Sequence, residues 1–166
     1  LPDRLAAFVG DADPHVIVRR YRDAFPEFSA SRVFFDVTSM QMISRNSLRI
    51  AKHRAEQAGA GAYVYELAYA TDIDGGKWRS PHTLDIPLVF DNVQKSRSMF
   101  GDTARAQEVA DDMSSAWLAF ATSGTPGGAA WPKWDETARQ AMVFDVDSAV
   151  VTGLRAKRSE ILREIP

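Results

Sequence analysis

Cysteine is absent from the sequence, which excludes disulfide bonds and cysteine-ligated metal sites. No apolar run approaches the roughly 18 residues that a membrane-spanning helix needs, and no signal peptide is visible. An excess of one charge is also absent, because 20 Lys and Arg stand against 22 Asp and Glu, for a net charge of -2. Without a basic stripe, the sequence gives no reason to expect a nucleic-acid partner. The compartment stays open, since proteins of several compartments lack cysteine.

The residues that are present favour a folded core. Hydrophobic residues make up 45% of the 166 positions, a share that argues against disorder. The length predicts one domain or a piece of a larger one, and no repeat or linker divides residues 1–166. The first residue is Leu rather than Met, so we expect a processed or shortened chain.

Two stretches show the three-to-four-residue spacing of amphipathic helices. The first is 39–58, and its predicted inward face is Met40, Ile43, Ser47, Ile50 and Ala51. The second is 102–123, where Asp102 or Thr103 can cap the start and Gly124 ends the helix. The predicted apolar stripe of this second helix is Val109, Met113, Ala116, Trp117 and Phe120. A further amphipathic helix is predicted at 154–165.

Residues 62–70 carry the strongest strand signal, because they are aromatic and aliphatic almost without interruption. That pattern is typical of a strand covered on both faces, as in a parallel sheet. A helix followed by such a strand is half of an α/β unit. A short strand is predicted at about 141–145. The predicted fold class is therefore α/β, mostly helical, with one central-type strand.

One of the three histidines stands out by its surroundings. His82 lies on a Pro-containing loop, about twelve residues beyond the predicted strand and just before an apolar helical turn. In open α/β sheets, active groups gather on loops at the carboxyl ends of strands. A histidine there can act as a general base, because it gains and loses a proton near neutral pH. His15, beside a turn, and His53, between two cations, are interpreted as solvated surface residues.

The segment around His82 also resembles a known family. Its sequence, Ser80-Pro81-His82-Thr83-Leu84-Asp85-Ile86-Pro87-Leu88-Val89-Phe90, is similar to the histidine segment of the type-B carboxylesterases, which include the cholinesterases. Those enzymes have an acidic residue three positions after the histidine, and then an aliphatic-Pro-aliphatic-Val-Phe run. Later family motifs are matched in the same order by residues 113–126, by Trp131-Pro132-Lys133-Trp134 and by Met142-Val143-Phe144-Asp145.

The resemblance implies the C-terminal portion of an α/β-hydrolase that acts on a carboxylic ester, with His82 as its catalytic histidine. The family's chain order is nucleophilic Ser, acid, His, so the Ser, the acid and the oxyanion-hole glycines are expected upstream of Leu1. The sequence accordingly contains no Gly-x-Ser-x-Gly. The fragment is expected to be inactive alone and to need no metal or organic cofactor. Thr83 departs from the family, in which a small residue usually follows the histidine.

A second interpretation belongs to a different class of protein: a non-catalytic interaction module, or an adhesion-type relative of the same fold. A Gly-x-Ser-x-Gly in the reading frame upstream of Leu1 would favour the enzyme. If the strand at 62–70 has lost its neighbours, its open edge would recruit other chains. The fragment is therefore expected to form a homo-oligomer, through strand addition or exchange of the segment before Gly59. The alternative is a compact monomer in which the helices at 39–58 and 102–123 fold over the strand and cover it.

The sequence also predicts roles for several other polar and aromatic residues. Trp78 is a candidate for lining a pocket mouth and binding substrate, while Asp85 is expected to cap a helix rather than to orient the histidine. Glu66 is expected at a sheet edge or paired with an arginine, because an unpaired buried carboxylate is costly. Asp72 and Asp74 lack the spacing of a calcium loop and are interpreted as turn residues.

Overall fold

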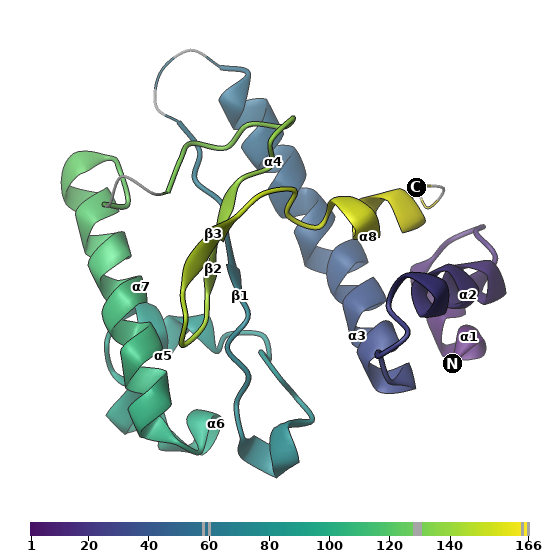
Figure 1. Ribbon diagram of the computed structural model, residues 1–166, viewed down its shortest axis with the longest axis horizontal. Helices are drawn as coiled ribbons and strands as arrows, with labels where there is room; N and C mark the ends of the chain where they lie inside the picture. Colours follow the sequence, from purple (N-terminus) through teal and green to yellow (C-terminus); the bar gives the residue numbers. More distant parts are fainter. Residues whose placement is uncertain (58, 60, 128–130, 164, 166) are drawn as a thin grey trace. The chain divides into compact units, whose positions relative to one another are not determined.

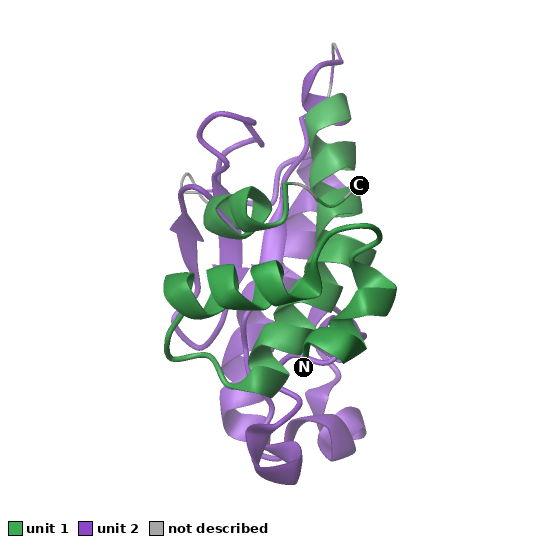
Figure 2. Ribbon diagram, turned by 90° about the vertical axis from the view of Figure 1, so that its right-hand side faces the viewer, with its two compact units in different colours: residues 1–53, 155–166 green, residues 54–154 purple. Residues whose placement is uncertain are grey.

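The computed structural model describes residues 1–57, 59, 61–127, 131–163 and 165. These residues form two compact units, one made of residues 1–53 and 155–166 and the other of residues 54–154 (Figure 2). Each unit has a hydrophobic core of its own. No helix in the described ranges is long and apolar enough to cross a membrane.

The first unit is helical. Its elements are α1 (Pro2–Leu5), η1 (Ala6–Phe8), α2 (Pro14–Ala24), α3 (Ala30–Ser39), the π turn η2 (Met40–Ser44), most of α4 (Arg45–Ala55), and α8 (Ala156–Ile161). The side chain of Asp13 caps α2 by accepting a 2.8 Å hydrogen bond from the N–H of His15. An ion pair of 2.7 Å between Arg158 and Asp36 joins α8 to α3. The helix predicted at 154–165 is present as α8, which is shorter and spans Ala156–Ile161.

The buried face of α3 and α4 differs from the predicted one. The buried apolar residues of this stretch are Val33, Val37, Met40, Leu48 and Ala51. The predicted inward residues Ile43 and Ile50 are instead 49% and 68% exposed. The physical reason is the π turn. Its wider i→i+5 hydrogen bonding rotates the following residues around the helix axis, so that a different set of side chains faces the core. The predicted limits 39–58 were also wrong, because the helical run begins at Ala30 and ends at Ala55.

The second unit holds a three-stranded sheet in the order β1 (Tyr65–Leu67), β2 (Ala141–Phe144), β3 (Ala149–Val151) (Figure 1). β1 and β2 are parallel, and β2 and β3 are antiparallel. The helical elements of this unit are η3 (Ile73–Gly76), α5 (Asp85–Val89), η4 (Val93–Ser96), α6 (Arg97–Phe100) and α7 (Thr103–Ser123). The α/β class and the short strand at about 141–145 are confirmed, whereas β3 was not predicted.

The predicted strand at 62–70 is regular over only three residues. Its backbone pairing reaches further, because the N–H of Trp134 donates to the carbonyl of Ala62 at 2.7 Å and the N–H of Ala68 donates to the carbonyl of Phe144 at 2.8 Å. Residues 61–68 are half-buried. The predicted strand is therefore confirmed with a shorter regular part, and among the described residues it pairs with β2 on one side.

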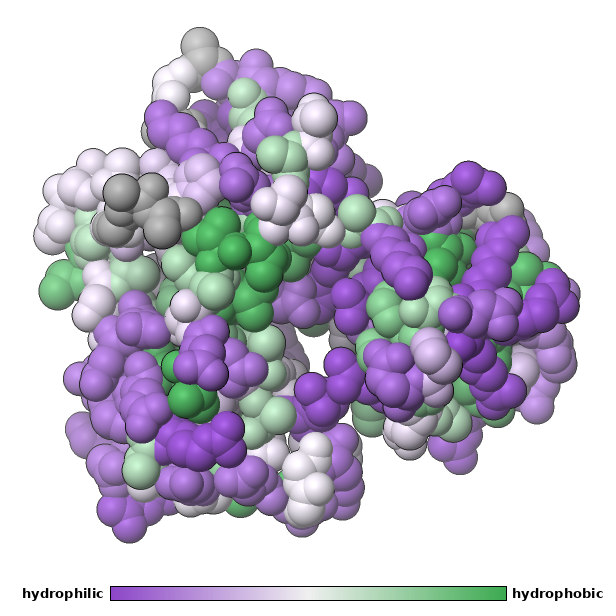
Figure 3. Space-filling view, viewed as in Figure 1, coloured by the Kyte–Doolittle hydropathy of each residue, from purple (hydrophilic) through white to green (hydrophobic). Residues whose placement is uncertain are grey.

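The limits of α7 are confirmed. The carboxylate of Asp102 accepts a 2.9 Å hydrogen bond from the N–H of Ala104, and Gly124 ends the helix in the left-handed conformation. The first half of α7 is buried through Ala106, Val109, Ala110 and Met113. Further along the helix, Trp117 and Phe120 are 42% and 43% exposed. The predicted stripe is thus covered over the first half of the helix only, and Figure 3 shows hydrophobic residues interrupting the hydrophilic surface of this unit.

Candidate active site

The loop that leads to His82 begins beyond the carboxyl end of β1. Tyr69 and Thr71 follow the strand and are each 1% exposed. The N–H of Thr71 donates a 2.8 Å hydrogen bond to the carbonyl of Arg79, and the Ser80 hydroxyl donates one of 2.5 Å to the carbonyl of Tyr69. These bonds close the base of the loop, so that the chain leaves the core and returns at a fixed point. His82 lies two residues beyond that point.

The hydroxyl of Thr71 holds the same loop base from a second side. Its Oγ1 donates a 2.6 Å hydrogen bond to the carbonyl of Met99 and accepts one of 3.2 Å from the N–H of Ile73. A threonine hydroxyl has one donor and two lone pairs, and buried polar groups are normally satisfied in this way. The loop is therefore fastened both to its own returning end and to α6.

His82 itself is exposed and stands between two anchored neighbours. Ser80 is bonded to Tyr69, and Leu84 is fully buried. No described residue forms a hydrogen bond with the His82 imidazole, so both ring nitrogens are available to other groups. Thr83 has a φ of 75°, in the left-handed region that a β-branched residue rarely adopts. The backbone is thus strained at the residue that follows the histidine.

Asp85 is held by a tyrosine. It lies in the first turn of α5, where a negative charge is favourable, but its side chain makes no capping bond. Instead it accepts a 3.1 Å hydrogen bond from the hydroxyl of Tyr65. Burial, and secondly the Asp85 carboxylate, raise the pKa of Tyr65 above its usual value. The expectation that Asp85 caps the helix was therefore wrong, because a strand residue 20 positions earlier in the chain is bonded to it.

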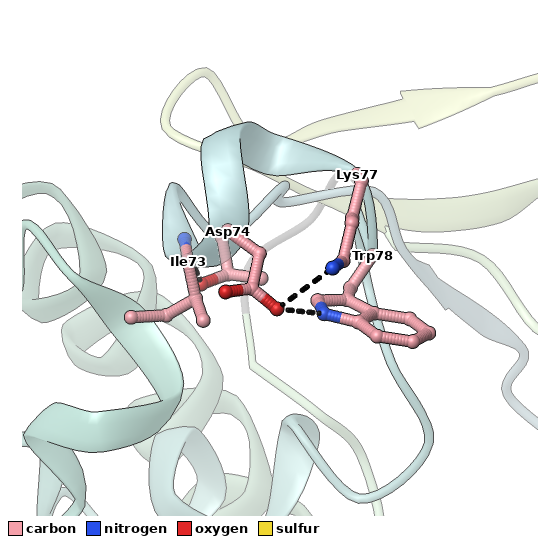
Figure 4. A network of polar contacts seen from close by, with 5 residues as sticks. Ile73, Asp74, Lys77 and Trp78 are labelled. Carbon is pink, nitrogen blue, oxygen red and sulfur yellow. Dashed lines mark hydrogen bonds and ion pairs between the residues drawn. The ribbon is translucent and has the colours of Figure 1, made fainter.

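Trp78 directly precedes Arg79 at the base of the loop and takes part in a small network of polar contacts (Figure 4). Its indole N–H donates a 2.8 Å hydrogen bond to Asp74, and Lys77 Nζ lies 3.1 Å from the same carboxylate oxygen. The bond from Trp78, and then the contact with Lys77, lower the pKa of Asp74. Trp78 is 48% exposed and lines neither of the two cavities described below. Its role in substrate binding stays a prediction.

The other polar residues that the sequence singled out lie on α2, on α4, on β1 and at η3. His15 and His53 are exposed on α2 and α4. Glu66 is half-buried on β1, at the edge of the described sheet. Among the described residues, no group of three or more His, Asp or Glu side chains is placed to hold a metal ion. Asp72 is the N-cap residue of η3 and Asp74 lies within this turn.

Two apolar cavities flank Tyr65 and Trp117, whose ring centroids lie 6.2 Å apart. The first, of about 290 Å³, lies between residues 61–65 and the last turns of α7. The second, of about 420 Å³, lies between α5 and α7 and reaches Asp85. Trp117 was predicted as part of the apolar stripe of this helix, and Tyr65 was not predicted as a site residue. The available signal was the run of large apolar residues over the last two turns of α7.

Comparison with known proteins identifies the family. The model of the Carboxylesterase family matches residues 16–162. The chain belongs to the carboxylesterase family. The match includes His82, α7 and the strands β1, β2 and β3, so the resemblance of the His82 segment to type-B carboxylesterases is confirmed at the level of the family.

Solved esterases share the fold of the chain. The carboxylesterase EST55 of Geobacillus stearothermophilus matches with a TM-score of 0.78 and 28% identity, over 96% of this chain and 34% of that one. A PNB esterase matches with a TM-score of 0.69 and 19% identity, over 97% and 32%. An esterase from the anaerobic Clostridium hathewayi matches with a TM-score of 0.68 and 18% identity, over 99% and 32%. The chain thus has part of an α/β-hydrolase fold and spans about a third of the length of these esterases.

Proposed function

We propose that this chain supplies the catalytic histidine, His82, to a serine carboxylesterase. The observation that carries the proposal is the position of His82 after β1, on a closed loop, inside the segment matched to the carboxylesterase family. An exposed imidazole with no partner among the described residues suits a group that must meet a nucleophile and an orienting acid. The substrate is proposed to be a small carboxylic ester.

The chemistry follows from what an imidazole can do. One ring nitrogen of His82 takes the proton of a serine hydroxyl as the serine oxygen attacks the ester carbonyl. The imidazolium then gives that proton to the departing alkoxide, which leaves an acyl-serine. In the second half of the reaction His82 takes a proton from water, the resulting hydroxide attacks the acyl group, and the proton returns to the serine oxygen. The serine, the acid and the oxyanion hole are proposed to come from the two thirds of the family fold that the chain does not span.

On this proposal the 166-residue chain has no esterase turnover by itself. Loss of triad members costs several orders of magnitude in rate, and here the oxyanion hole is also outside the chain. The measurement is hydrolysis of short p-nitrophenyl esters, compared with free imidazole at the same concentration. Turnover that a serine-directed phosphonate abolishes would show a nucleophile within these residues and overturn this part of the proposal.

The role of His82 is tested in the complete reading frame. His82→Gln is expected to lower kcat by about 10³-fold or more, as for other triad members. His15→Gln and His53→Gln are matched controls, because both replace an exposed histidine on a helix of the first unit, and they should retain full activity. A loss of less than tenfold in His82→Gln would exclude this residue as the base. An upstream sequence without Gly-x-Ser-x-Gly would favour the interaction module instead.

A further inference from the structure

The segment that carries His82 is fastened at both of its ends to β1 and its continuation. At the start of the segment, the Ser80 hydroxyl donates a 2.5 Å hydrogen bond to the carbonyl of Tyr69. At its end, the Asp85 carboxylate accepts a 3.1 Å hydrogen bond from the hydroxyl of Tyr65. The first bond belongs to the loop base, whereas the second joins a side chain of the strand to the first turn of α5. His82 therefore lies between two fixed points.

The turn between His82 and Asp85 is short and closed. The N–H of Leu84 donates a 3.1 Å hydrogen bond to the carbonyl of Pro81, and this bond encloses His82. The side chain of Leu84 is fully buried. Asp85 follows directly and begins α5. Because no flexible stretch separates the turn from Asp85, a displacement of α5 at its first residue also displaces the histidine.

The ring of Tyr65 is held in place from two sides. Its centroid lies 5.7 Å from that of Phe144 on β2 and 6.2 Å from that of Trp117 on α7, both in edge-to-face geometry. Burial, and secondly the Asp85 carboxylate, raise the pKa of the Tyr65 hydroxyl, which therefore keeps its proton at neutral pH. The hydroxyl is thus a donor of fixed position, and Asp85 is bonded to a packed ring.

We propose that Tyr65 is a positioning residue for His82 and acts through its hydrogen bond to Asp85. This inference rests on the proposed function, since it needs His82 to be the catalytic base. A general base must lie within hydrogen-bond reach of the proton that it takes, so a small displacement lowers the rate of the chemical step. Binding of the ester does not need the proton transfer. Loss of the tyrosine hydroxyl should therefore lower kcat and leave KM nearly unchanged.

The first test compares two tyrosine hydroxyls in the complete reading frame. Tyr65→Phe removes the hydroxyl and keeps the packed ring, and it should lower kcat about tenfold or more, with KM changed less than about twofold. Tyr63→Phe is the matched control, because Tyr63 is also half-buried, lies two positions earlier in the chain, and has a hydroxyl without a hydrogen bond to any described residue. It should keep the native kcat. Equal kcat values for the two variants would overturn the proposal.

The second test concerns the acceptor. Asp85→Asn keeps an oxygen that can accept from Tyr65, whereas Asp85→Leu has a similar size and no acceptor. Asp85→Leu should lose as much kcat as Tyr65→Phe, and Asp85→Asn should retain a kcat at least about fivefold higher than that of Asp85→Leu. The double variant of Tyr65→Phe and Asp85→Leu should be no slower than either single variant, because both remove the same bond. Losses that multiply in the double variant would contradict the proposal.

The third test shows whether Tyr65 acts through the histidine. In a His82→Gln background the bond has no base to position, so Tyr65→Phe should change the residual rate less than about twofold. A further loss as large as in the native background would show a general effect on the fold and overturn the proposal. Circular dichroism of each variant at the assay temperature verifies that the folded state is the one measured.

The same variants separate this inference from the proposed function. If His82→Gln lowers kcat less than tenfold, His82 is not the base, and both the proposed function and the positioning role fail. If His82→Gln lowers kcat about 10³-fold while Tyr65→Phe behaves like Tyr63→Phe, the proposed function stands and only the positioning role fails.

Discussion

The hydroxyl of Thr71 donates a 2.6 Å hydrogen bond to the main-chain carbonyl of Met99, 28 residues further along the chain. Thr71 is 1% exposed, and its main-chain N–H is bonded to Arg79 on the returning end of the same loop. One residue thus connects the end of β1, the base of the loop and α6. Because His82 follows this loop base, Thr71 contributes to its position without lying beside it.

Thr71→Val is the first prediction. Valine matches the shape of threonine but leaves the Met99 carbonyl and the Ile73 N–H without their partner, and a buried unsatisfied group costs about 1 to 3 kcal/mol. We expect the free energy of unfolding, measured in urea, to fall by that amount. Thr71→Ser keeps the hydroxyl and should be clearly more stable than Thr71→Val. Equal stability of the two variants would show that the hydrogen bond contributes nothing.

The bond between Tyr65 and Asp85 predicts a dependence of stability on alkaline pH. The folded state raises the pKa of Tyr65 above its unfolded value of 10.0, because burial and the Asp85 carboxylate disfavour the phenolate. A raised pKa means that the unfolded chain loses this proton first, so the contribution is complete below pH 10 and declines as the pH rises above it. Tyr65→Phe should be less stable at pH 7 and lose stability less steeply above pH 10.

Denaturant unfolding at pH 7, 9 and 10.5 measures this difference, since other groups titrate alike in both proteins. Asp85→Asn is the matched variant, because an amide oxygen can still accept from the tyrosine while the charge is gone. It should fall between the native chain and Tyr65→Phe in its alkaline slope. If the free energy of unfolding changes with pH in the same way in all three proteins, the ionisation of Tyr65 does not cause the loss of stability at alkaline pH.

Trp78→Ala, made in the complete reading frame, tests the predicted contribution of Trp78 to substrate binding. If the exposed indole contacts the ester, KM for aryl esters should rise severalfold while kcat changes less than twofold, as expected for binding that is uniform along the reaction. Lys77→Ala is the control, because Lys77 shares the Asp74 carboxylate but offers no aromatic ring. An unchanged KM in Trp78→Ala would leave the residue as part of the loop's own structure.

The features that could be predicted from the sequence are those that depend on residues close together along the chain. The ends of α7 follow from Asp102 and Gly124, each of which acts within its own turn. The parallel pairing of β1 follows from its composition and from the helix that precedes it. The exposure of Ile43 and Ile50 was not predictable from a fixed helical period, because the π turn Met40–Ser44, which contains Ile43 and precedes Ile50, changes that period.

The contacts of the candidate site depend on distances across the fold and were not predictable in the same way. Asp85 stands at a position where either a capping or an orienting role fits the sequence, and only the tertiary placement of Tyr65 decides that it accepts a tyrosine hydroxyl. The position of His82 was predicted from a family motif, whereas the closure of its loop through Ser80 and Thr71 was not. Serine and threonine are common in loops, so their presence in the sequence did not indicate which main-chain groups they bond.

The backbone strain at Thr83 gives the last prediction. Its φ of 75° is unfavourable for a residue with a β-branched side chain and costs glycine nothing. Thr83→Gly should therefore raise the free energy of unfolding by about 1 kcal/mol, even though glycine also gains freedom in the unfolded chain. Thr83→Ala retains a Cβ and should stay close to the native chain. If the two variants are equally stable in urea, the left-handed backbone is not the source of the strain. If glycine alone stabilises, the strain lies in the backbone that directly follows His82, where a change of conformation would turn the imidazole.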